Sequence, residues 1–140
     1  MSDYRYGLAW SEKFELQNEE VDSQHRRLFE LLSELVAACM DGTDTVKLKE
    51  TLDFLVDYTI KHFLDEEMLQ LRYNYPDYKN HRQMHEAFKI TVSELVLKYD
   101  RNGSSIELSN DVNKIIIQWL VNHIQKEDMK IGRHIRKITG

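Results

Sequence analysis

The chain has 140 residues, which is enough for one domain with a substantial hydrophobic core and too few for two ordinary domains. A hydrophobic content of 41% suits a globular protein, and a net charge of -5 without a cluster of Lys and Arg argues against a nucleic-acid partner. The single cysteine, the lack of any apolar run of about 18 residues and a start without signal-peptide character predict a cytoplasmic protein without membrane insertion.

Long helices are predicted because one proline and five glycines in the whole chain leave few turn signals. The hydrophobic pattern places four of them at residues 22–40, 45–71, 77–99 and 109–131. Short connections favour antiparallel neighbours, so the expected fold is all-α, an antiparallel up-down-up-down four-helix bundle. We expect residues 1–140 to form this single domain, with an N-terminal extended segment along the bundle.

The first predicted helix begins with Asp22 as its N-cap and ends before Asp41 and Gly42. Its apolar stripe consists of residues at helical spacing, namely Leu28, Phe29, Leu32, Leu35 and Val36. Three residues before this stripe lies His25. A histidine is therefore predicted to lie in line with the core.

The second predicted helix has an apolar seam that becomes polar in its last turns. Steps of four and three residues give Leu48, Leu52, Leu55, Thr59, His62, Glu66 and Leu69. Burying an unpaired carboxylate is costly, so Glu66 needs a partner in the core. Its neighbours Asp65 and Glu67 are expected to face solvent.

The third and fourth predicted helices carry histidines on their inner faces as well. The third follows Pro76 and gives the seam His81, His85, Phe88, Val92, Leu95 and Tyr99. The fourth gives Val112, Ile116, Leu120, His123 and Ile124. In an antiparallel bundle these polar stretches meet, so five histidines should converge at one end. The sixth, His134, is expected in a solvated tail beyond the fourth helix.

Five converging histidines indicate a metal site, because packed neutral imidazoles would otherwise leave ring nitrogens without partners. The pair His81-x-x-x-His85 is a common chelate for Zn, Fe or Cu, and Glu66 can bridge two metals. These donors exceed the four ligands of a tetrahedral zinc site, and no cysteine is nearby to hold an iron–sulfur cluster. A two-metal centre is therefore predicted, with iron and manganese both compatible with the nitrogen and oxygen donors.

The order of these residues resembles the signature of the hemerythrin family. In chain order it reads His25, His62-x-x-x-Glu66, His81-x-x-x-His85 and His123-x-x-x-x-Asp128. The flanks VDSQH, HFLDEE and WLVNHIQKEDMKIG are similar to the bacteriohemerythrins, the single-domain bacterial members. The resemblance covers nearly the whole chain.

The resemblance implies two iron ions joined by a bridging oxo or hydroxo group. One iron would be held by His81, His85 and His123, the other by His25 and His62, and both by Glu66 and Asp128. The open position on the second iron implies reversible dioxygen binding by a carrier, storage or delivery protein rather than an enzyme. Mainly neutral donors agree with reversible chemistry. We expect the dioxygen pocket to be lined by Leu28, Phe63, Leu120 and Ile124.

Other functions compatible with the same donors remain open. One is a di-iron enzyme acting on nitric oxide, peroxide or ferrous iron, although no acid–base residue near the open position indicates turnover. Another is an oxygen- or iron-sensing module, and a third is a structural zinc bundle. An oxygen-using enzyme or a reductase is the expected class of protein partner.

Asp128 does not fit the periodicity of a regular helix. Five residues after His123 it lies roughly 140° around an ideal α-helix, whereas Glu127 is better aligned. The family pattern nevertheless points to Asp128. A wide inner face or a local bulge in the fourth helix is therefore predicted.

Overall fold

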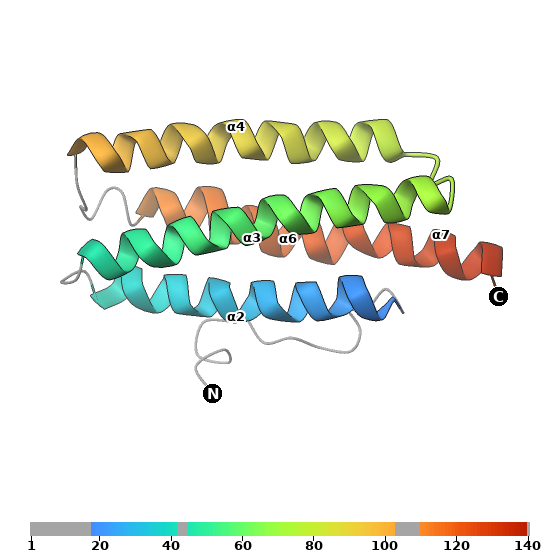
Figure 1. Cartoon of the computed structure of the whole chain (residues 1–140), viewed down its shortest axis with the longest axis horizontal. Helices are drawn as coiled ribbons and strands as arrows, with labels where there is room; N and C mark the ends of the chain where they lie inside the picture. Colours follow the sequence, from blue (N-terminus) through green and yellow to red (C-terminus); the bar gives the residue numbers. More distant parts are fainter. Residues whose placement is uncertain (1–17, 42–44, 103–109, 140) are drawn as a thin grey trace.

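The computed structural model describes residues 18–41, 45–102 and 110–139, and these form an antiparallel four-helix bundle (Figure 1). The helices in chain order are α2 (Glu19–Asp41), α3 (Thr45–Arg72), α4 (Tyr78–Asn102) and a fourth stretch composed of η2 (Val112–Ile117), α6 (Gln118–His123), η3 (Ile124–Asp128) and α7 (Met129–Thr139). Successive helices run in opposite directions, which confirms the predicted up-down-up-down bundle. The predicted N-terminal extended segment lies outside the described residues.

Helix α2 begins three residues earlier than predicted, because Asn18 caps it instead of Asp22. The backbone N–H of Val21 donates to Asn18 Oδ1 over 3.1 Å, as expected of an N-cap residue. Asp22 is buried within the first turn. Both residue types cap helices well, so the sequence alone did not separate them. The added turn buries Val21, and this burial favours the earlier start.

A Schellman turn ends α3 and directs Tyr75 back into the bundle. Asn74 adopts a left-handed conformation with φ 53°, which asparagine tolerates better than most residues. The N–H of Tyr75 donates to the carbonyl of Gln70 over 2.9 Å, and that of Asn74 to Leu71 over 3.2 Å. Tyr75 is consequently 8% exposed, beneath the start of α4.

The fourth helix continues to Thr139, so the prediction that it ends near Ile131 was wrong. The extension buries Ile135 as well as Ile131. His134 is half-buried in this extension and donates from Nε2 to the carbonyl of Tyr73 over 2.8 Å. Its expected place in a solvated tail was therefore also wrong. The added turns cover the end of the bundle and tie α7 to the α3–α4 connection.

The core consists of two apolar clusters separated by a polar layer. The larger cluster includes Leu28 on α2, Leu48 on α3 and Leu95 on α4. The smaller cluster comprises Val21, Leu69, Tyr75, Ile131 and Ile135. Along α2 and α3, His25 and Glu66 fall between members of the two clusters. The histidines therefore converge inside the bundle and not at its open end, because the smaller cluster closes that end.

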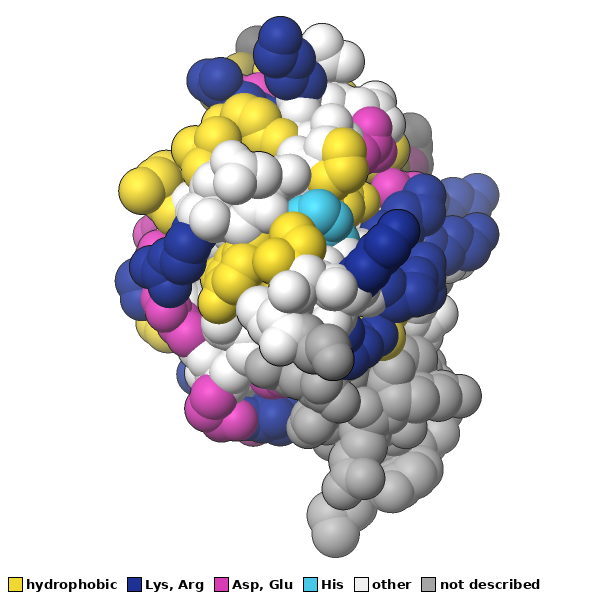
Figure 2. Space-filling view, turned by 90° about the vertical axis from the view of Figure 1, so that its right-hand side faces the viewer, with side chains coloured by type: hydrophobic (Ala, Val, Ile, Leu, Met, Phe, Trp, Pro, Cys, Tyr) yellow, Lys and Arg dark blue, Asp and Glu magenta, His cyan; other side chains and the backbone are white. Residues whose placement is uncertain are grey.

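The outer surface of the bundle carries charged side chains with exposed ion pairs such as Arg27–Glu30 and Lys49–Asp53, at 2.9 and 3.2 Å. Pairs of this kind contribute little to stability. Figure 2 looks onto the end of the bundle where α7 finishes, and Lys and Arg side chains gather along one side of it. No helix in the described part of the chain is long and apolar enough to span a membrane.

Replacement of Leu35 by alanine should destabilise the bundle without touching the polar layer. Leu35 is 0% exposed in the larger cluster, and truncation of such a leucine costs about 2–5 kcal/mol. Urea unfolding followed by circular dichroism measures the loss. The control is Leu97→Ala, since Leu97 is 59% exposed and its truncation should change stability by under about 0.5 kcal/mol. Equal losses in the two variants would contradict this assignment of the core.

Candidate metal centre

The polar layer brings together all seven side chains that the sequence singled out as candidate ligands. Every one of them is at most 5% exposed: His25, His62, Glu66, His81, His85, His123 and Asp128. They form two overlapping groups whose nitrogen and oxygen atoms lie within 4.8 Å of one another. Glu66 and Asp128 belong to both groups, so the two groups share their carboxylates.

The first group contains three histidines from α4 and α6. The Nε2 atoms of His81 and His85 lie 3.0 and 3.1 Å from Nε2 of His123. Glu66 Oε1 lies 3.0 Å from His81 Nε2 and 3.4 Å from His85 Nε2. Asp128 Oδ1 lies 3.1 Å from Nε2 of both His81 and His123.

The second group contains two histidines, one each from α2 and α3. Their Nε2 atoms, on His25 and His62, lie 3.0 Å apart. Glu66 Oε2 lies 3.3 Å from His25 Nε2 and 3.2 Å from His62 Nε2. Asp128 Oδ2 lies 3.0 Å from His25 Nε2. Each carboxylate therefore turns one oxygen toward each group, which is the arrangement a bridging carboxylate needs.

A π-helical segment brings Asp128 to the same side of the fourth helix as His123. This segment, η3, spans Ile124–Asp128 and directly follows His123. A π-helix bonds residues five apart, so His123 and Asp128 lie about one turn above each other. Of the two predicted explanations, a wide inner face or a local bulge, the structure shows the bulge. Glu127, the residue better aligned in a regular helix, is half-buried and pairs with Lys130 at 3.2 Å.

A second layer of polar residues holds two of the histidine rings from behind. Glu67 Oε2 lies 2.8 Å from His85 Nδ1. Gln24 Oε1 lies 2.8 Å from His62 Nδ1, and Gln24 Nε2 donates to Asp65 Oδ2 over 2.7 Å. These partners fix which nitrogen of each ring faces the centre of the layer.

Sequence reasoning missed this second layer. Glu67 was expected to face solvent, but it is 8% exposed, and Asp65 is half-buried. The signal was a second seam on α3, since Phe63, Glu67 and Gln70 follow one another at steps of four and three and all three are buried. A helix that packs against neighbours on two sides buries a face wider than a single seam of residues, so residues beside the first seam are buried too.

Aromatic rings pack against the histidines of the first group. Phe63 stacks on His85 with ring centroids 3.8 Å apart and an interplanar angle of 3°. Trp119 stacks on His123 at 4.5 Å and 10°. The four residues expected to line a dioxygen pocket are all buried beside the polar layer: Leu28, Phe63, Leu120 and Ile124. Apart from the polar partners at Nδ1, buried apolar and aromatic side chains therefore surround the imidazoles.

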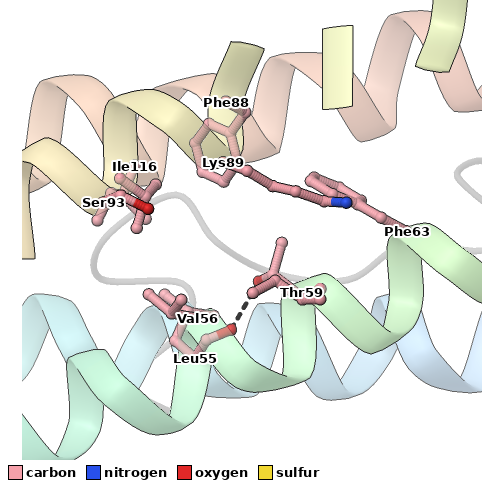
Figure 3. A pocket seen from close by; sticks show the side chains of 10 residues that line it. Leu55, Val56, Thr59, Phe63, Phe88, Lys89, Ser93 and Ile116 are labelled. Atoms are coloured by element: carbon pink, nitrogen blue, oxygen red, sulfur yellow. Dashed lines mark hydrogen bonds between the residues drawn. The ribbon is translucent and has the colours of Figure 1, made fainter. Parts of the chain in front are cut away.

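A small apolar cavity of about 50 Å³ lies between α3 and α4 and reaches Phe63 (Figure 3). Thr59 and Lys89 are among its lining residues. The hydroxyl of Thr59 donates to the carbonyl of Leu55 over 2.7 Å, so this donor is already used within α3. The ammonium of Lys89 pairs with Glu86 at 3.1 Å. The cavity therefore suits a small apolar molecule better than an ion.

The pKa values of the buried groups show that the polar layer stabilises positive charge. Burial lowers the pKa of His25, but Asp128 and Glu66 outweigh that effect and raise it to about 9. The same two carboxylates raise the pKa of His81 to about 10 against the effect of burial. Burial raises the pKa of Glu66, and the surrounding imidazoles hold it well below its usual range. Two ionised carboxylates are therefore stable here only beside cations.

Two buried oxygens indicate that metal cations suit the layer better than protons. Glu66 Oε2 and Asp128 Oδ1 accept no hydrogen bond from any described residue, although imidazole nitrogens lie close to both. Leaving buried oxygens without partners is costly. Nitrogen and oxygen donors converging on two adjacent points are suitable ligands for first-row transition metals. The residues present therefore fit a pair of metal ions.

Comparison with known proteins places this donor set in a family. Residues 17–135 match the family described as Hemerythrin HHE cation binding domain. The chain is 30% identical to a bacteriohemerythrin of Stenotrophomonas maltophilia over 92% of this chain and 82% of the relative. It is 31% identical to a myohemerythrin of Theromyzon tessulatum over 86% of this chain and 88% of the relative.

A solved structure supports the fold. A crystal structure of a hemerythrin variant, in which one leucine is replaced by tyrosine, superposes with a TM-score of 0.78, at 23% identity, over 91% of this chain and 95% of that one. The chain belongs to the hemerythrin family of cation-binding domains. Its buried cluster of histidine, glutamate and aspartate is the metal-binding site of that domain.

The metal-free protein should lose stability as the pH rises from neutrality. A histidine whose folded pKa is raised contributes fully below its unfolded pKa of 6.5, and the contribution is lost as pH rises through the folded pKa. For His25 and His81 this window extends to about 9 and about 10. Thermal unfolding of the metal-free protein, followed across this window, measures the effect.

The matched control for this pH series is the double variant Glu66→Gln/Asp128→Asn. It removes the charges that raise the two histidine pKa values, so its melting temperature should change less over the same range. Parallel pH profiles in the two proteins would contradict the electrostatic account of the layer.

Proposed function

We propose that the site holds two iron ions and binds dioxygen reversibly, so that the protein is an oxygen carrier, store or delivery protein. His81, His85 and His123 would hold one iron, His25 and His62 the other, with Glu66 and Asp128 bridging both. The observation that carries this proposal is the pair of donor groups that share two carboxylates but differ in their number of histidines. Three histidines against two leave one position free on the second iron.

The side chains around the layer support reversible binding rather than turnover. A pair of ferrous ions with one free position supplies the electrons and the coordination site that dioxygen needs. The chain itself has to keep water away, because water competes for that position and speeds irreversible oxidation. Leu28, Leu120 and Ile124 offer no polar side-chain atoms and are almost fully buried. The apolar cavity at Phe63 adds a space that suits a gas molecule.

The donor set also supports a carrier over an oxygen-inserting enzyme. Five of the seven proposed ligands are imidazoles, which bind metals in their neutral form, and only Glu66 and Asp128 bring negative charge. A centre with few anionic ligands stabilises highly oxidised iron poorly. Relatives named bacteriohemerythrin and myohemerythrin, at about 30% identity, support the same proposal.

Anaerobic loading with ferrous iron tests the proposal directly. We expect two irons per chain by metal analysis, and a visible absorption that appears when oxygen is admitted and disappears when it is removed. A single metal per chain would contradict the two-iron site. An absorption that never reverses, or catalytic consumption of nitric oxide or peroxide, would favour a di-iron enzyme instead.

Replacement of Leu120 by alanine should shorten the lifetime of the oxygenated protein. Leu120 is 1% exposed, lies three residues before His123, and its truncation opens space for water beside the layer. Decay of the visible absorption in air measures this lifetime. The matched control is Leu35→Ala, which removes an equally buried leucine roughly three turns from the nearest candidate ligand on its own helix. Equal lifetimes of the oxygenated form in the two variants would contradict the assignment of Leu120 to the oxygen pocket.

A further inference from the structure

Two histidines in different metal positions are held by chemically different partners. In the first group, His85 Nδ1 meets the carboxylate of Glu67 directly at 2.8 Å. In the second group, His62 Nδ1 meets the amide oxygen of Gln24 at the same distance. Behind the amide, the carboxylate of Asp65 accepts a hydrogen bond from Gln24 Nε2.

The hydrogen-bond chain selects the tautomer of each ring in its neutral, metal-binding form. An ionised carboxylate only accepts hydrogen bonds, so Gln24 must donate its amide N–H to Asp65. The amide oxygen then faces His62, which has to donate from Nδ1. His85 donates from Nδ1 to Glu67 for the same reason. When each ring is neutral, Nε2 therefore keeps its lone pair for a metal at the centre of the layer.

The two partners have unequal effects on the rings. A carboxylate that accepts from Nδ1–H makes the imidazole a stronger metal ligand, and loss of such a partner commonly costs about 10–100-fold in metal affinity. A neutral amide polarises the ring less. The aromatic surroundings of the two rings differ as well. Phe63 stacks on His85, whereas its ring is tilted relative to that of His62, at 6.2 Å between centroids.

We propose that Glu67 and the pair Gln24–Asp65 are positioning residues that make the two metal positions unequal. The metal held by His81, His85 and His123 is retained, whereas the metal held by His25 and His62 is the first to exchange. The exchangeable metal is then the one with the free position. This inference rests on the proposed two-metal site and adds an order of metal loss to it.

Metal release to an excess of chelator tests the inference on the loaded full-length protein under anaerobic conditions. With ferrous iron as the probe, we expect two phases of equal amplitude, one metal per chain in each. Glu67→Gln should speed the slow phase by about 10–100-fold and leave the fast phase nearly unchanged. The matched control is Glu86→Gln, an exposed residue on α4 that pairs with Lys89 away from the layer, which should alter neither phase.

A double variant at Gln24 and Asp65 that keeps the net charge distinguishes a positioning role of these residues from a role in packing alone. The double variant Gln24→Glu/Asp65→Asn places the carboxylate directly on His62 and leaves an amide behind it to donate. It should slow the fast phase toward the slow one, by about 10–100-fold. A role limited to packing would not predict slower release. Urea unfolding of each metal-free variant verifies that the bundle is intact.

The outcomes distinguish this inference from the proposed function. Two metals released in a single phase, or two phases that neither variant changes, would overturn the unequal positions and leave the two-metal site standing. An effect of Glu67→Gln on the fast phase alone would reverse the assignment and also overturn it. Fewer than two metals per chain in the unaltered protein would overturn both proposals.

Discussion

The burial of two carboxylates in the middle of a helical bundle is the constraint on which the rest of this structure depends. Glu66 and Asp128 are almost fully buried, and each presents its two oxygens to different imidazoles. Such charges are tolerable in a low-dielectric interior only beside positive charge and hydrogen-bond donors. All four helices contribute to this requirement, since each brings at least one histidine or carboxylate to the layer. The apolar clusters on either side keep water out and strengthen every interaction inside it.

Local distortion of the fourth helix is a consequence of the same constraint. A regular helix would place Asp128 away from His123, and the π-helical segment η3 removes that difference. The extension of the helix through α7 then closes the layer from the far side with Ile131 and Ile135. The contact of His134 with the carbonyl of Tyr73 fixes that closure to the α3–α4 connection. The bundle therefore encloses its polar layer from both ends.

The second layer connects packing to the chemistry proposed for the site. Gln24 and Glu67 do not belong to the donor groups, yet they determine which nitrogen of His62 and His85 is available to a metal. Because one partner is neutral and the other charged, two positions built from similar ligands need not behave alike. Two unequal metal positions suit a site in which one metal exchanges and the other is retained.

The four helices and the polar stretch of each inner seam could be predicted from the sequence, because a helical period records which residues share a face. The antiparallel order followed from the short connections between the helices. The helical period showed His62 and Glu66 at positions where leucine is expected. The five-residue spacing from His123 to Asp128 required either a wide inner face or a local bulge. The width of each inner face, the ends of the helices and the polar residues behind the candidate ligands depend on how the helices pack, and they became clear only in the structure. Asn18 and Asp22 are equally good caps by type, and Glu67 reads as a surface residue in a charged run. Their roles depend on neighbouring helices that lie far away in the chain. The second seam that includes Glu67 is visible in the sequence, but only those neighbours decide that it is buried.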